Sequence, residues 1–165
     1  MNHQCSYILS VFQTVILLGG FIIGIRQIIL MTNQMRDQVD WQKKNVTFEY
    51  LNLYITQFKD LNTSLQKKIN LLKQNGRSAN LETLIEELKD ENTRSQLFHL
   101  VSYFENLAIG ITHNYFDESI AKALLSNVVI STFKSLKPYL LIRRDETNLI
   151  VGSNFEKLAN KWSNV

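Results

Sequence analysis

Residues 7–25 of the chain read YILSVFQTVILLGGFIIGI, and this stretch decides the architecture. It contains no Lys, Arg, Asp or Glu, and all 33 charged side chains of the chain lie from Arg26 onward. As an α-helix it would be about 28 Å long, close to the hydrocarbon thickness of a bilayer. The sequence therefore predicts a transmembrane helix over residues 7–25, preceded by an extracytoplasmic N-terminus over residues 1–6.

Two other interpretations of this stretch stay open. A buried helix of a soluble protein is usually shorter, about 10 to 14 apolar residues, and is flanked by charges on both sides. A cleaved signal peptide carries basic residues before the apolar run and small residues at the cleavage site. MNHQCS before the run has no Lys or Arg, and LMTNQM after it has no small-x-small pattern. These flanks favour a span that is retained.

The basic residues nearest the span predict its orientation. No Lys or Arg precedes it, whereas Arg26, Arg36, Lys43 and Lys44 follow it. By the positive-inside rule, the N-terminus is outside and the rest of the chain is cytoplasmic. The same four side chains are candidates for contact with anionic lipid head groups.

Small and polar residues within the span are candidates for contact between helices. Gly20 and Gly24 are four residues apart and let two backbones approach closely, and Gly19 widens the notch. Gln13 and Thr14 could line a pore or form hydrogen bonds between helices. The alternative is that Gly is simply frequent in membrane spans.

A heptad-like seam continues from the span into the predicted juxtamembrane helix over residues 26–45. Its positions are spaced alternately three and four residues apart, and they are Ile25, Ile28, Thr32, Met35, Val39, Gln42 and Val46. Such spacing is typical of helices that pack along one face. It favours self-association over packing against the protein's own body, which remains the alternative.

Residues 46–165 predict an all-α cytoplasmic helical domain. The clearest helix covers about residues 93–115, and its inward positions are Leu97, Leu100, Val101, Phe104, Leu107, Ala108 and Ile111. Asp117 is a plausible N-cap for the next helix, which Pro138 should kink or end. SNFE at residues 153–156 predicts a capping box for the last helix.

Two further local expectations concern a loop and a carboxylate. KQNGRSAN at residues 73–80 is the clearest loop, and its Asn80 can cap a following helix. Glu105 lies among apolar neighbours, so we expect it to be partly buried beside an Arg or Lys of another helix.

Charge is unevenly distributed along the body. Residues 82–118 carry eight acidic and two basic side chains, whereas residues 122–165 carry seven basic and three acidic ones. The simpler explanation is solvated helix faces and contacts between unlike segments. The more specific hypothesis is an anionic-ligand site for a nucleotide or oligonucleotide, formed by Lys134, Lys137, Arg143 and Arg144.

The sequence contains none of the common catalytic or metal-binding motifs. HExxH, CxxC, GxSxG, GxxxxGK[ST] and GxGxxG are absent, and His99 and His113 are 14 residues apart. We therefore expect no enzyme, no catalytic residue, no metal site and no cofactor. An enzyme of unrecognised type remains the third hypothesis.

Several segments resemble a bacterial membrane-anchored family of unknown function. They are FEYLNLY (48–54), YFENLAI (103–109), FKSLKPYL (133–140) and NFEKLANKW (154–162). The resemblance covers most of the chain, although TNQMRDQVDWQKK is poorer in Arg than expected of the family. It implies one N-terminal span and a small helical domain, in a single-pass protein of the inner (cytoplasmic) membrane.

The architecture is also similar to that of the membrane effector subunit of the Hailong anti-phage defence system. This resemblance implies a homotetrameric ion channel controlled by nucleic-acid oligomers from a partner nucleotidyltransferase. Two functions are therefore expected above others: an oligomeric membrane effector gated by an anionic ligand, or a membrane-tethered protein-binding module without channel activity.

Overall fold

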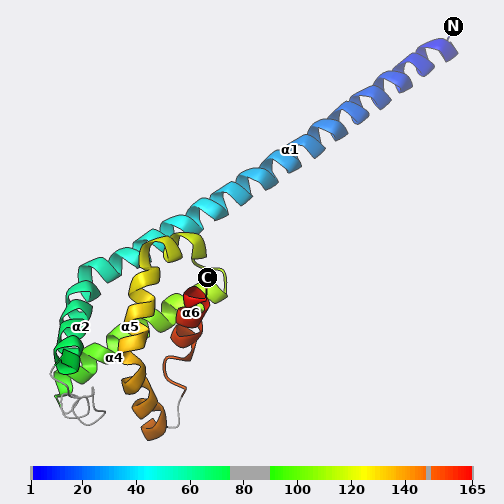
Figure 1. The fold of residues 1–165 in the computed structure, drawn as a ribbon. Helices are drawn as coiled ribbons and strands as arrows, with labels where there is room; N and C mark the ends of the chain where they lie inside the picture. Colours follow the sequence, from blue (N-terminus) through cyan, green and yellow to red (C-terminus); the bar gives the residue numbers. More distant parts are fainter. Residues whose placement is uncertain (1, 75–89, 148–149, 165) are drawn as a thin grey trace. The chain divides into compact units, whose positions relative to one another are not determined.

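A computed structural model describes residues 2–74, 90–147 and 150–164 of the chain, with side chains over residues 13–67, 90–147 and 150–164 (Figure 1). All of the regular structure in these ranges is helical, which confirms the predicted all-α fold. The elements are α1 (Asn2–Leu53), η1 (Tyr54–Phe58), α2 (Lys59–Gln74), α4 (Glu91–Thr112), α5 (Glu118–Thr147) and α6 (Ser153–Ser163).

The chain divides into two units, Met1–Gln42 and Lys43–Val165. The first unit is the N-terminal part of α1, and the second begins within the same helix. The predicted limits at residues 7, 26 and 46 all fall inside α1, so no break in the helix marks them. They stay predictions.

The second unit has a core of aromatic and aliphatic side chains. All seven predicted inward positions of α4 are buried, which confirms the periodicity of that helix. α6 packs against both α4 and α5, while α2 packs against α5 (Figure 1). Phe104 of α4 stacks on Phe155 of α6 with ring centroids 4.8 Å apart.

The last turns of α1 belong to this core. Tyr50 stacks on Tyr103 of α4, with centroids 4.9 Å apart, and each hydroxyl donates to the other residue's carbonyl oxygen. Burial raises the pKa of Tyr50 to about 12. Thr47 is fully buried, and its hydroxyl oxygen accepts a 2.8 Å hydrogen bond from the backbone N–H of Asp117. Residues 43–53 of α1 are thus fixed to α4 and to the turn that follows it.

Asp117 caps α5 as predicted. Its carboxylate accepts hydrogen bonds from the backbone N–H groups of Ser119 and Ile120, at 2.9 and 3.1 Å. The turn before it is tight: the ring of Phe116 lies so close to Gly110 that a Cβ there would be 2.2 Å from it.

Two expectations about helix ends differ from the structure. Of the two effects expected of Pro138, the helix end is wrong, because α5 continues to Thr147 and the missing proline N–H is tolerated inside the helix. A kink at this proline stays a prediction. α6 has no capping box at SNFE, because its N-cap is Gly152 in the left-handed conformation, which has no side chain to accept a hydrogen bond.

The cap of α6 comes from another helix instead. The carboxylate of Glu105 on α4 accepts hydrogen bonds from the backbone N–H groups of Asn154 and Phe155, at 3.1 and 2.8 Å. It also accepts one from the Asn154 side chain at 2.8 Å. The Arg or Lys partner expected for Glu105 is therefore wrong: helix N–H groups hold this carboxylate, as they hold other anions.

Part of the loop expected over residues 73–80 is helical, because Lys73 and Gln74 lie in α2. The remainder of that loop and the predicted cap Asn80 lie outside the described residues.

Candidate functional site

A π-helical turn separates α1 from α2. Within it the backbone N–H of Lys59 donates to the carbonyl oxygen of Tyr54, five residues earlier. The hydroxyl of Thr56 donates to the carbonyl oxygens of Asn52 and Leu53, at 3.0 and 3.3 Å. Single π turns inside longer helices often occur at functional sites.

The π turn accompanies a buried polar cluster. Because a π turn winds less per residue than an α turn, Tyr54 and Asn62 share a face although they are eight residues apart. The Asn62 amide nitrogen donates to the Tyr54 hydroxyl and to the Thr132 hydroxyl, both at 2.9 Å. All three residues are buried. Burial raises the pKa of Tyr54, and the hydrogen bond from Asn62 opposes that shift.

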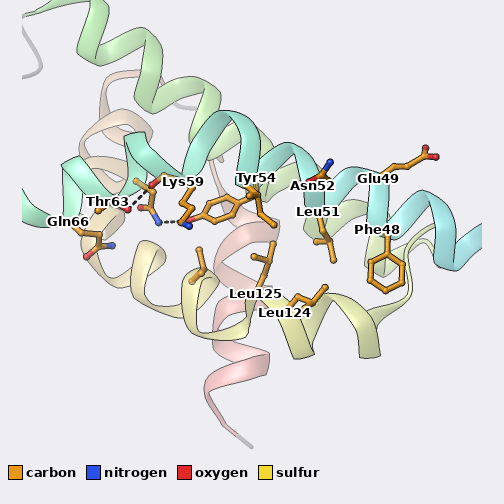
Figure 2. A pocket seen from close by; sticks show the side chains of 13 residues that line it. Phe48, Glu49, Leu51, Asn52, Tyr54, Lys59, Thr63, Gln66, Leu124 and Leu125 are labelled. Carbon is orange, nitrogen blue, oxygen red and sulfur yellow. Dashed lines mark hydrogen bonds between the residues drawn. The ribbon is translucent and has the colours of Figure 1, made fainter.

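Tyr54 and Asn62 of this cluster line a groove of about 830 Å³ between the α1–η1–α2 run and α5. Leu51 from one wall and Leu125 from the other point into it (Figure 2). Its lining residues are Phe48, Glu49, Leu51, Asn52, Tyr54, Ile55, Lys59, Asn62, Thr63, Gln66, Leu124, Leu125 and Val128.

The two ends of the groove differ in chemistry. Phe48, Leu51 and Leu124 make one end mostly apolar, with the Glu49 carboxylate at its edge (Figure 2). Lys59, Thr63 and Gln66 gather at the other end (Figure 2). The apolar rim is open to solvent, since Ile55 and Leu124 are 61% and 56% exposed. The groove can therefore receive an apolar body and place a hydrogen-bond acceptor or an anion near Lys59. Its volume is in the usual range for small-molecule sites, about 300 to 1,000 Å³.

The predicted anion-binding residues lie outside this groove, on α5. Lys134 and Lys137 are exposed. Arg143 forms a 2.8 Å ion pair with Glu146, and Arg144 forms one of 2.8 Å with Glu156 of α6.

The structure does not gather these four side chains into one cluster. Lys134 and Arg143 are nine residues apart, which places them on opposite sides of α5. Arg144 also donates from Nε to the carbonyl oxygen of Val151, so it joins α5 to the start of α6. Arg143 instead lines a second pocket of about 400 Å³ beside Glu105. An anionic-ligand site at these residues stays a prediction.

The predicted span residues lie on an unburied helix. Gln13, Thr14 and Gly20 are exposed, and a Cβ on Gly19, Gly20 or Gly24 would meet no other part of the described chain within 4 Å. Of the predicted membrane-surface residues, Arg26, Arg36 and Lys44 are exposed. Lys43 is half-buried, and its ammonium donates a 2.5 Å hydrogen bond to the side chain of Asn114.

Sequence reasoning missed the groove. No motif of the sequence marks Tyr54, Asn62 or Thr132 as members of one cluster. Asn62 and Thr132 differ from other polar residues only in lying at positions where the helical period predicts an inward side chain. Within the described residues no group of three or more His, Cys, Asp or Glu side chains is placed to hold a metal ion.

These features define an all-helical protein in which one described helix, near the N-terminus, is long and apolar enough to cross a membrane. Residues 14–162 match the family described as "Domain of unknown function (DUF4760)", so the chain belongs to this family. Membership of a family of unknown function is thereby confirmed. Comparisons with curated proteins and with solved structures gave no match.

Proposed function

We propose that the protein is an oligomeric single-pass membrane effector whose helical body binds a ligand and biases the packing of its spans. The observation that carries this proposal is the exposure of α1. Its apolar side chains from Val15 to Met31 are exposed, with fractions from 43% at Ile25 to 73% at Leu17. A soluble monomer rarely leaves so large an apolar surface in water, so lipid and other copies of α1 are the natural cover.

The predicted seam supports self-association in the same way. Ile28, Met35 and Val39 are 67%, 57% and 63% exposed. The described side chains of the first unit therefore leave this seam available to another helix. A seam that begins at the bilayer surface suits parallel copies anchored side by side.

The continuity of α1 offers a way to connect ligand binding with the span. α1 runs from Asn2 to Leu53, and Phe48, Leu51 and Asn52 of the same helix line the groove. A ligand that binds one packing of these helices more tightly than another would shift the equilibrium between them.

From the sequence and the Hailong resemblance, we also propose that the effector is a tetrameric ion channel of the inner membrane, gated by an anionic ligand. The same sources suggest a role in anti-phage defence. The partner nucleotidyltransferase comes from that resemblance as well. A pore would take its polar lining from groups such as Gln13 and Thr14. We propose no catalytic residue.

Conductance of purified protein in planar lipid bilayers tests the channel. We expect current when a candidate oligonucleotide is added to the cytoplasmic side, and less current when Lys134 and Lys137 are both changed to Glu. If a verified oligomer passes no current, with or without oligonucleotide, the protein is not a channel of the proposed kind.

The groove favours a second candidate, a membrane-tethered binding module in which the span serves only as an anchor. Its occupant would be an amphipathic small molecule: the apolar part lies along Leu51 and Leu125, and an anionic or carbonyl group faces Lys59. Replacing residues 7–25 with an unrelated span should then leave binding intact.

Native mass spectrometry of the purified protein measures this binding directly. We expect a bound small molecule in the wild type and in the span-replaced chain, and its loss in Ile55→Gln with Leu124→Gln. Ile150→Gln is the matched control, because Ile150 is 77% exposed and does not line the groove. Equal adducts in all variants, or none in the wild type, would contradict the binding module.

A further inference from the structure

One face of α1 in the first unit carries four amides and two glycines, with Ile16 and Met31 between them. We call it the amide stripe, and its members are Gln13, Gly20, Gly24, Gln27, Gln34 and Gln38. Their spacings are seven, four, three, seven and four residues, which keeps them on one side of an α-helix. All of its members from Gln13 to Gln38 lie within the single helix α1.

The opposite face of the same helix is aliphatic. Val15, Leu18, Ile22 and Ile29 lie there, and they are 54% to 61% exposed. Such a face suits lipid chains, whereas the amide stripe does not. Gln13 lies inside the predicted span, where an amide is costly unless it is hydrogen-bonded, so the span has a lipid side and a side that needs a polar partner. Gln27, Gln34 and Gln38 continue the same face beyond the span.

The stripe is complementary to itself. A glutamine amide carries both donors and acceptors, so the same residue at the same depth in a parallel copy can satisfy it. Gln13 and Gln27 are 14 residues apart, about 21 Å along the helix, and stand on either side of the glycine pair. Gly20 and Gly24 have no Cβ to keep neighbouring helices apart, which lets the flanking amides reach one another.

We propose that the amide stripe faces the axis of a parallel bundle of copies of this chain, with the Gln13 and Gln27 amides hydrogen-bonded between copies. This inference rests on the proposed self-association and specifies its face. The seam through Ile28, Thr32 and Val39 lies beside the stripe on the helix surface, roughly a quarter turn away. In a bundle of more than two helices the stripe points inward and the seam contacts the neighbouring helix.

Disulfide cross-linking in membrane vesicles tests the face. The native Cys5 is first changed to Ser, and single cysteines are then introduced as Gln27→Cys and Gln34→Cys. The matched controls are Ile29→Cys and Asn33→Cys, at similar depths but turned away from the stripe. After mild oxidation we expect cross-linked dimers at both stripe positions and several-fold fewer at both control positions.

The possible outcomes separate the face from the self-association. Cross-linking that is strongest at Ile29→Cys would leave an oligomer standing and overturn the amide stripe as its inner face. Cross-linking at no position, with the mass of one chain, would overturn both the inference and the proposed oligomer. Cross-links to a different membrane protein, without dimers of this chain, would also overturn it.

A second pair of variants tests the amides themselves. Gln13→Leu with Gln27→Leu keeps the apolar length of the span but removes both amides. We expect a lower oligomeric fraction in mild detergent than for Val15→Leu with Ile29→Leu, which changes only the opposite, aliphatic face. An equal oligomeric fraction in both double variants would contradict hydrogen bonding through the stripe.

Discussion

The two units of the chain handle apolar side chains in opposite ways. In Lys43–Val165, large side chains such as Phe104, Phe155 and Leu107 are fully buried. In Met1–Gln42, Phe21 is 69% exposed and Ile22 is 59% exposed, on a single helix. The body contains its own core, whereas the apolar side chains of the N-terminal unit from Val15 to Met31 are exposed. Substitutions of the same type should therefore have different effects in the two units.

The largest contrast is expected between two phenylalanines. Phe104→Ala removes a buried ring stacked on Phe155, and we expect it to lower the free energy of unfolding of the body by about 3 to 5 kcal/mol. Phe21→Ala, on the exposed helix, should leave that free energy unchanged. Urea unfolding of the full chain in lipid nanodiscs measures both.

Fluorescence of Trp162 reports on the body alone once Trp41 is changed to Phe. Trp162 is buried, at 4% exposed, whereas Trp41 is 67% exposed. A loss of body stability in Phe21→Ala as large as that in Phe104→Ala would break the distinction between the units.

Two glycines give the next contrast. Gly110→Ala would place a Cβ 2.2 Å from the Phe116 ring, so the turn after α4 must shift, at a cost of about 1 to 3 kcal/mol. Gly20→Ala meets no described atom within 4 Å in the single chain and should leave the unfolding of the body unchanged. The same urea experiment compares them, and a Gly110→Ala body as stable as the wild type would contradict the packing described here.

A smaller effect is expected at the helix cap. Glu105→Ala removes the acceptor for the first N–H groups of α6, at a cost of about 0.5 to 2 kcal/mol. Glu49→Ala is the control, because Glu49 bonds to Asn45 one turn away on the same helix. If both variants unfold at the same urea concentration, Glu105 does not cap α6.

The smallest effect is a dependence on pH. The hydrogen bond from Lys161 holds the pKa of Glu118 below its ordinary value of 4.5. Hydrogen bonds from the Ser119 hydroxyl and the Ile120 N–H hold that of Asp117 below 3.8. Because both pKa values are lowered in the folded chain, their stabilisation is complete above pH 4.5 and is lost as the pH falls through the folded values.

The urea concentration at the midpoint of unfolding should decrease as the pH is lowered from about 6 to about 3. We expect a shallower decrease in Asp117→Asn with Glu118→Gln, which cannot titrate at these positions. Asn can still cap α5, so the comparison isolates the titration. An identical pH profile in the double variant would show that other carboxylates carry the acid sensitivity.

The sequence predicted the features whose residue pattern repeats along a helix or lies within a few neighbouring residues. The helical period of α4 identified seven of its nine buried positions, because a long amphipathic helix repeats its signal over many turns. The N-cap role of Asp117 was also predictable, since the cap and its N–H donors are neighbours in the chain.

The features that the sequence did not predict depend on tertiary contacts or on the π turn. The Glu105 carboxylate accepts hydrogen bonds from backbone N–H groups 49 and 50 residues away. Residue types do not identify such donors, because almost every residue has a backbone N–H. Arg144 forms an ion pair with Glu156 and a hydrogen bond to the Val151 carbonyl oxygen, because the path of the chain into α6 brings both next to it. The groove needs the π turn at Tyr54–Phe58 to align Asn62 with Tyr54, and no simple residue pattern indicates such a turn.

The mass of the protein in lipid nanodiscs tests most directly whether α1 gathers copies of the chain. The wild type should give a multiple of the single-chain mass, and Gly20→Leu with Gly24→Leu should shift it toward one chain. A wild-type mass of one chain at every protein-to-lipid ratio would contradict the account.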